Sequence, residues 1–323
     1  MSVRPFDWRD LPTLYRYRHR SIYLDTALVL TRGPLLLPGA FLSTLTPAMG
    51  VETVVYEKKG TRKPVIIGQV IHAKNSPFAH LTFLAPDHAL DSPDLITLLD
   101  SLVVHSGESG VFHLIAEVDE KNQAFEALRR SSFAIYGRQR IWQFNGLPGA
   151  AYTIKESTGK AQSFAWREAV STDLVAIRSL YNDLVPGLVQ QVEPFSLSQK
   201  PTGLVCEQNG GLLAYVDVVY GGRGIWAQPF IHPDVDEVNG KLVSLIQTLN
   251  NRRSKPVYLC VRSYQAWLET VLEELGAEAG PRQAVMVKHM AVPIRAARSI
   301  SVPAMESGQP EISTPIARTE NRT

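Results

Sequence analysis

The chain has 323 residues, and 33 Lys or Arg against 31 Asp or Glu leave a net charge of only +2. A charge so close to zero does not favour nucleic acid or an anionic membrane as a partner of the whole molecule. Its two cysteines cannot form a disulfide framework, and neither Cys nor His residues show the spacing of a metal site, so no metal is expected.

The N-terminal segment does not have the pattern of a secretory signal, because charged residues stand where an apolar run is needed. The longest charge-free segment, from Gly33 to Val51, contains three prolines that would break a membrane-spanning helix. We interpret it as an irregular apolar connector. The expected location is therefore the cytoplasm, with no membrane partner.

Four landmarks occur twice in the same order, which indicates an internal repeat. The first is an Arg followed six residues later by Asp-Leu, before a predicted helix. The others are a strand that ends in Pro-Asp, an apolar helix, and a strand followed by a helix. In chain order the pairs begin at Arg4 and Arg167, Phe83 and Phe230, Leu95 and Leu242, and His113 and Tyr258.

Each half therefore predicts the order strand, helix, connector, hairpin, strand, helix, strand, helix and final hairpin. The fold class is α+β, with two mixed β-sheet domains in tandem. A composition rich in Pro, Ser, Thr, Arg and Glu, without periodicity, predicts a disordered tail. The expected boundaries are 1–145 for the first domain, 146–163 for the linker, 164–290 for the second domain and 291–323 for the tail.

This layout resembles the GNAT N-acyltransferase superfamily. Trp226 to Pro233 looks like the family's fourth strand with its proline exit, and Gly276 looks like the family's late Gly-Phe signal. In the first half Ser132-Phe133 takes the place of that signal. The resemblance implies two GNAT-like domains.

The resemblance also implies acetyl-CoA as a co-substrate, held where the fourth strand parts from the fifth. In the family a glycine-rich turn and the following helix bind the pyrophosphate. Ile231 ends the corresponding strand, and Asn239, Gly240 and Lys241 are the residues of the second half that could serve a phosphate. Asp236 lies where the family has a cation or glutamine and would repel the anion.

Three residues are candidates for proton transfer. Glu117 ends a strand at the expected cleft of the first half, although a solvated strand end is the alternative. His232 follows the fourth strand of the second half and could equally be an ordinary half-buried histidine. The usual tyrosine of the family is Leu128 in one half and Leu272 in the other, so only Tyr264, from a different direction, could replace it.

Two functions remain open. The first is an N-acyltransferase that moves an acyl group from acyl-CoA to an amine, with at most one working CoA site, in the second half. The alternative is a catalytically silent tandem scaffold that binds another small molecule, or a protein partner at the apolar connector. A homodimer fits either hypothesis.

Overall fold

The computed structural model describes residues 2–34, 50–57, 64–74, 76–145, 166–195, 201–208, 210–253 and 255–289. They belong to one compact unit, Met1–Ala291. The predicted linker and tail lie outside the described residues, as does most of the apolar connector.

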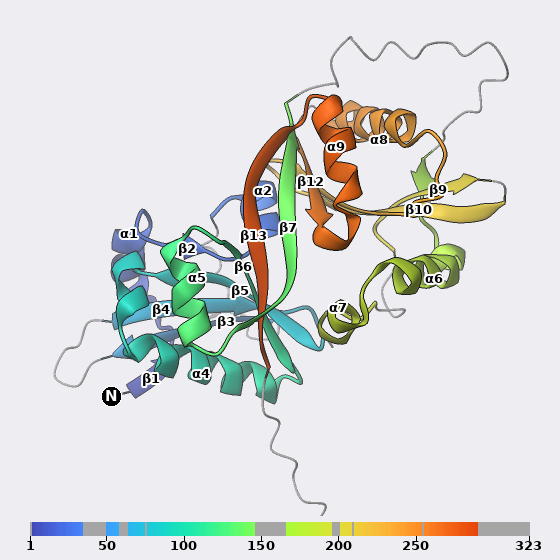
Figure 1. Ribbon diagram of the computed structural model, residues 1–323. Coiled ribbons are helices and arrows are strands. Elements are labelled where there is room, and N and C mark those ends of the chain that lie inside the picture. Colours follow the sequence, from blue (N-terminus) through green and yellow to red (C-terminus); the bar gives the residue numbers. More distant parts are fainter. Residues whose placement is uncertain are drawn as a thin grey trace, which may run out of the picture. The chain divides into compact units, whose positions relative to one another are not determined.

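Figure 1 shows the helices and strands of both halves. The first half contains β1 (Ser2–Pro5), α1 (Leu11–Tyr17), β2 (Ile22–Tyr23), α2 (Thr26–Arg32), β3 (Val51–Glu57), β4 (Pro64–Ile71), β5 (Phe78–Ala85), α4 (Asp94–Glu108), β6 (His113–Asp119), α5 (Gln123–Arg130) and β7 (Ala134–Phe144). The second contains β8 (Arg167–Glu168), α6 (Leu174–Leu184), α7 (Gly187–Val192), β9 (Gly203–Gln208), β10 (Gly211–Tyr220), β11 (Ile225–Ile231), α8 (Val238–Arg253), β12 (Val257–Arg262), α9 (Trp267–Glu274) and β13 (Glu278–His289).

Local sequence explains these elements. In α4 the buried residues Leu95, Leu98, Leu99 and Leu102 recur at helical spacing and form the face that packs on the sheet. Helix α5 begins at Asn122, whose side chain accepts a hydrogen bond of 2.9 Å from the Ala124 N–H. The predicted hairpin of the second half is confirmed, because β9 and β10 pair antiparallel.

The strands of the described residues form one sheet in the order β1-β3-β4-β5-β6-β13-β7-β12-β11-β10-β9-β8. The last strand of each half is exchanged. β13 comes from the second half but pairs with β6 of the first, and β7 comes from the first half but pairs with β12 of the second. The two exchanged strands pair with each other and cross the middle of the unit (Figure 1).

The predicted final hairpins are wrong. β7 and β13 are each a single long strand, and neither folds back on itself. A returning strand is unnecessary, because the other half supplies the neighbour that completes the backbone hydrogen bonds. Gly280 and Pro281 lie at a register shift between β13 and β7.

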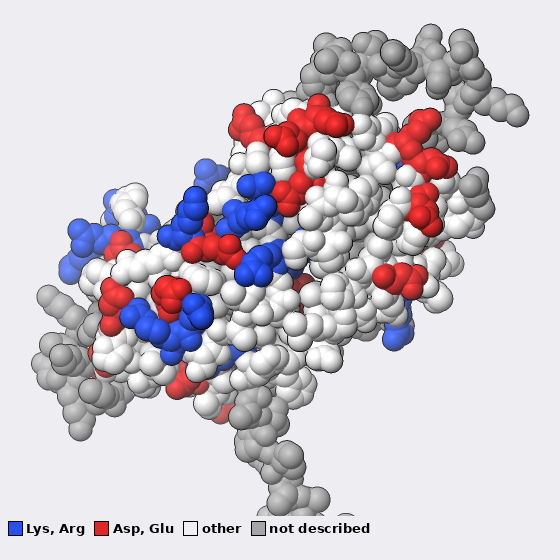
Figure 2. Space-filling view, in the orientation of Figure 1, with Lys and Arg blue, Asp and Glu red and all other residues white. Residues whose placement is uncertain are grey.

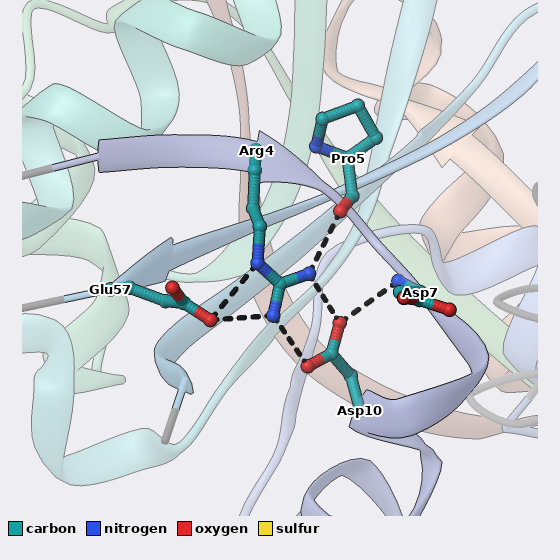
Figure 3. Close-up of polar contacts among 5 residues, drawn as sticks. All are labelled: Arg4, Pro5, Asp7, Asp10 and Glu57. Carbon is teal, nitrogen blue, oxygen red and sulfur yellow. Dashed lines mark hydrogen bonds and ion pairs between the residues drawn. The ribbon is translucent and has the colours of Figure 1, made fainter. Parts of the chain in front are cut away.

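A shared side-chain motif supports the internal repeat. Arg4 donates to both carboxylate oxygens of Asp10 at 2.7 Å and also contacts Glu57 (Figure 3). Asp10 in turn accepts from the Asp7 N–H at 2.9 Å. The second half repeats every contact: Arg167 donates to Asp173 and Glu207, and Asp173 accepts from the Val170 N–H at 2.9 Å.

Helix α2 belongs to the first half but packs against the second. Leu30 and Ala27 contact a small apolar cluster around Trp226 and Cys260. The chain approaches so closely that a Cβ on Gly221 would lie 2.1 Å from the Thr31 carbonyl oxygen. Glycine is required there by space, which explains one residue of the Gly-rich turn before β11.

On the face in Figure 2, Lys and Arg lie mostly over the first half and the crossing strands, whereas Asp and Glu prevail over the second half. Positive and negative side chains are thus unevenly distributed on this face, although the net charge of the chain is small. Among the described residues, no helix is long and apolar enough to cross a membrane.

Candidate functional site

In each half a pair of parallel strands parts after three residue pairs. β5 pairs with β6 only over 78–80, and β11 pairs with β12 only over 225–227. We call these places the N-terminal fork and the C-terminal fork. In β11 the Ile225 N–H donates to the Pro256 carbonyl. The N–H groups of alternate residues therefore face β12, and after Ala227 the next residue in that position is Pro229. Proline has no N–H, which explains why this ladder ends there.

The N-terminal fork is filled by the chain itself. β2 pairs with the outer part of β5, and the next residue, Leu24, connects both strands. Its N–H donates to the Thr82 carbonyl of β5 at 2.9 Å, and its carbonyl accepts from the Glu117 N–H of β6 at 2.8 Å. Leu24 is fully buried. Residues 22–24, here called the wedge, therefore use the backbone groups that an extended ligand would need.

Glu117, a predicted catalytic residue, lies beside this wedge and is buried. One carboxylate oxygen accepts from the Thr26 N–H at 2.9 Å. Burial raises the pKa of Glu117, and the nearby Asp25 carboxylate raises it further. The structure places Glu117 in a packed interior rather than at the solvated strand end that was the alternative.

Replacing Glu117 with glutamine should stabilise the protein at alkaline pH. The raised pKa means that the folded state binds the proton of Glu117 more tightly than the unfolded state does. The contribution of protonated Glu117 to stability is therefore complete below pH 4.5 and is lost as pH rises through the folded pKa. Glutamine keeps the acceptor for Thr26 and removes the buried charge. The melting temperature of Glu117→Gln should therefore exceed that of wild type at pH 8 and match it near pH 4.

The control for this series is Glu108→Gln, at an exposed position near the end of α4. It should leave the melting temperature almost unchanged at both pH values. A Glu117→Gln variant that is less stable than wild type at pH 8 would contradict the argument.

In the C-terminal fork a side chain bridges the strands. The amide of Gln265, in the 3₁₀ turn after β12 (Ser263–Gln265), donates to the Ile231 carbonyl at 2.8 Å. Gln265 is buried. Ile231, predicted to contact the co-substrate, therefore already has a partner on this carbonyl. His232, the next residue, accepts a hydrogen bond from the Asp234 N–H through Nδ1 and helps to fix the turn.

The predicted phosphate residues lie at the start of α8, where their side chains have protein partners. Asn239 donates to Glu274 at 3.3 Å, and the buried Lys241 donates to Gln208. Gln208 also accepts from the Asp236 N–H and donates to the Asp236 carboxylate. Gly240 lies between them in the first turn of the helix.

The charge of this turn does not suit a pyrophosphate. The carboxylates of Asp234, Asp236 and Glu237 precede the helix, and the one buried cation, Lys241, is directed to Gln208. These carboxylates repel an anion that the helix dipole would otherwise attract. Glu237 has φ of 51°, a left-handed conformation that glycine adopts more readily than glutamate. The residues present do not fit the pyrophosphate of acetyl-CoA.

A cavity of about 400 Å³ lies next to the C-terminal fork. Its walls come from both halves and include Asp25, which follows the wedge, and residues of β5, α6, α7, β10 and β11. Tyr264 is the one predicted site residue that lines it. The other polar lining residues include Asp25, His80, Glu193, Asp217 and Gln228, and the rings of Phe78, Tyr181, Phe195, Tyr215 and Phe230 form much of the rest.

Three polar side chains form a row across the fork. Asp217 on β10 lies directly opposite Gln228 on β11, and Gln228 interacts with the Tyr264 hydroxyl. Burial raises the pKa of both Asp217 and Tyr264. Asp217 was missed because it reads as one polar residue in an apolar strand. The sequence signal that could have identified it is the presence of a carboxylate in a largely apolar strand.

A buried ion pair lies behind this row. Arg262, at the end of β12, donates through Nη2 to both oxygens of Glu193 at 3.1 and 3.2 Å, and Tyr136 donates to the same carboxylate. Burial alone would lower the pKa of Arg262, but Glu193 and Tyr136 hold it well above its ordinary value. Nε and Nη1 of Arg262 are buried without a hydrogen-bond partner. Among the residues that the structure describes, no group of three or more His, Cys, Asp or Glu could hold a metal ion.

A scan of protein-family models and a search of curated protein sequences both give no match. Solved structures do match. A tandem GNAT protein from the clavulanic acid biosynthesis pathway, without acetyl-CoA, has a TM-score of 0.52 at 12% identity, over 90% of this chain and 99% of that one. A GCN5-related N-acetyltransferase from Sphaerobacter thermophilus has a TM-score of 0.53 at 10% identity, over 90% and 96%.

A third structure, a glucosamine N-acetyltransferase region of a fungal multi-domain GH3 β-N-acetylglucosaminidase, has a TM-score of 0.53 at 12% identity. The match covers 89% of this chain and 38% of that one. Identities this low carry the fold and not the activity. Together with the two forks, the exchanged strands and the repeated Arg-Asp-Glu motif, these structural matches show that this chain has the tandem GNAT fold.

Proposed function

We propose that this chain is a small-molecule-binding protein built on the tandem GNAT fold, with the cavity beside the C-terminal fork as its site. The observation that carries the proposal is that the chain itself fills the places where the family resemblance predicts acetyl-CoA, whereas the cavity is open. The wedge fills the N-terminal fork, and acidic residues with Gln208 close the turn before α8. A volume of about 400 Å³ is sufficient for one small organic ligand.

The second candidate is N-acyl transfer from acyl-CoA to an amine at the C-terminal fork. It is favoured by the parting of β11 from β12 and by the row of Asp217, Gln228 and Tyr264 beside that fork. A carboxylate and a phenol are groups that can accept and donate the protons of such a reaction. The named structural neighbours include acetyltransferases, which is consistent with this candidate.

Titration with acetyl-CoA separates the two candidates. A binding protein without a CoA site should give no calorimetric heat and no thermal shift at about 1 mM acetyl-CoA. An enzyme with a Kd of about 100 μM would gain about 1.4 kcal/mol of stability at that concentration. Any such gain should disappear in Gly240→Glu, which adds a charge to the first turn of α8.

The matched control is Gly107→Glu, which changes an exposed glycine of α4 in the same way. Acetyl-CoA binding that is lost in Gly240→Glu and kept in Gly107→Glu would overturn the binding-protein proposal in favour of the enzyme. A thermal-shift screen of small amines, alcohols and acids, repeated on Ala73→Trp at the exposed rim of the cavity, tests the proposal directly. Hits should lose their shift in that variant.

A further inference from the structure

The wedge that fills the N-terminal fork also positions a residue of the cavity. Leu24 is held between β5 and β6, and the next residue, Asp25, lines the cavity. One oxygen of Asp25 accepts from the Leu28 N–H at 2.9 Å and caps α2. The backbone contacts that fill one fork therefore fix the position of a carboxylate in the site of the other half.

A second carboxylate reaches the cavity from the C-terminal half. Asp217 is half-buried and accepts from the hydroxyls of Thr202 at 3.1 Å and Tyr215 at 3.3 Å. Neutral hydroxyl donors leave its negative charge uncompensated. Removing such a group from water is unfavourable unless a positive charge lies nearby.

The cavity contains three carboxylates, but only one has a cation. Glu193 is paired with Arg262. Within the described ranges, neither Asp25 nor Asp217 forms an ion pair with Lys, Arg or His. Lys74 also lines the cavity, but this residue is exposed to solvent. The two unpaired carboxylates give the site a preference for positive charge.

The remaining walls suit the body of an organic cation. Tyr181, Phe195, Phe230 and Tyr215 form a continuous set, with ring centroids 5.5 to 6.0 Å apart. Aromatic faces attract ammonium and guanidinium groups as well as apolar carbon. His80 adds a buried Nδ1 that has no hydrogen-bond partner, and in the suitable tautomer it would accept from an ammonium N–H.

We infer that the cavity binds a small organic cation, an ammonium with an aromatic or apolar body, anchored by Asp25 of the N-terminal half and Asp217 of the C-terminal half. This inference rests on the proposed binding function and names its ligand class. The site is composite: it exists because the wedge of one half places Asp25 in the cavity of the other. An acyl donor is not required for binding.

The test is calorimetry on the full chain without acetyl-CoA, using phenethylamine, its neutral counterpart 2-phenylethanol and the anion 3-phenylpropionate. Phenethylamine should bind at least tenfold more tightly than either of the others. Asp25→Asn and Asp217→Asn should each weaken it about tenfold, since each keeps the size of the side chain and removes its charge. Asp183→Asn, at an exposed position of α6, should leave the affinity unchanged.

The outcomes separate this inference from the proposed function. If the neutral or anionic probe binds as tightly as the amine, the cation class is wrong and the binding function stands. If phenethylamine binds but neither Asp variant weakens it, the composite anchor is wrong. If none of the three probes binds, the inference is overturned, and the broader screen with Ala73→Trp decides the binding function separately. Melting curves of both Asp variants verify that they fold.

Discussion

Replacing Leu24 with alanine should lower the free energy of unfolding by about 2–5 kcal/mol, the range for removing a fully buried leucine side chain. Leu24 is entirely inaccessible and packs in the core of the N-terminal half. The side chain anchors a segment whose backbone is bonded to both β5 and β6, so the change should also loosen the wedge. Urea unfolding measures the loss of stability.

Hydrogen exchange gives an independent readout of the same segment. The Leu24 amide donates to the Thr82 carbonyl of β5, and the Glu117 amide of β6 donates to the Leu24 carbonyl, so both should exchange slowly in wild type. Both should exchange faster in Leu24→Ala. Leu188→Ala, at an exposed position of α7, should change neither stability nor exchange. Rapid exchange of both amides in wild type would show that the wedge does not fill the fork in solution.

Removing Arg262 should have an effect of similar size. Arg262→Met leaves Glu193 without its cation in a largely buried site, and deleting one partner of such a pair costs about 3–5 kcal/mol. The double variant Arg262→Met with Glu193→Gln should recover at least half of that loss, since it leaves no isolated charge. Chemical unfolding of the four proteins forms a double-mutant cycle.

The surface pair of Arg129 and Glu126 provides the comparison. Its atoms are 3.3 Å apart, similar to the buried pair, but both side chains are more than half exposed. Arg129→Met should cost less than about 1 kcal/mol. Equal effects at Arg262 and Arg129 would mean that water screens both pairs, contrary to the burial of Arg262.

The sequence predicted the elements well where local patterns decide them. The leucine stripe of α4, the turn between β9 and β10, and the Arg-Asp spacing of the two halves each depend on neighbouring residues. It also predicted the tandem GNAT layout, which the solved structures support. For the site, only Tyr264 of the seven predicted residues lines the cavity.

The remaining features depend on contacts between residues far apart in the chain. Nothing near Leu24 indicates that its backbone bonds to Thr82 on one side and Glu117 on the other. The exchange of β7 and β13 is equally invisible, because a strand has the same residue pattern whichever half supplies its partner.

The sequence by itself thus determined the repeated unit and most of its strands and helices, and it predicted the loss of the glycine-rich turn. Only the tertiary structure decided that one fork is filled by the chain and that Asp25 reaches a cavity shared with Asp217. Periodicity records whether a residue faces the core or solvent. The identity of its partner depends on strand pairing at long range, which leaves no periodic signal.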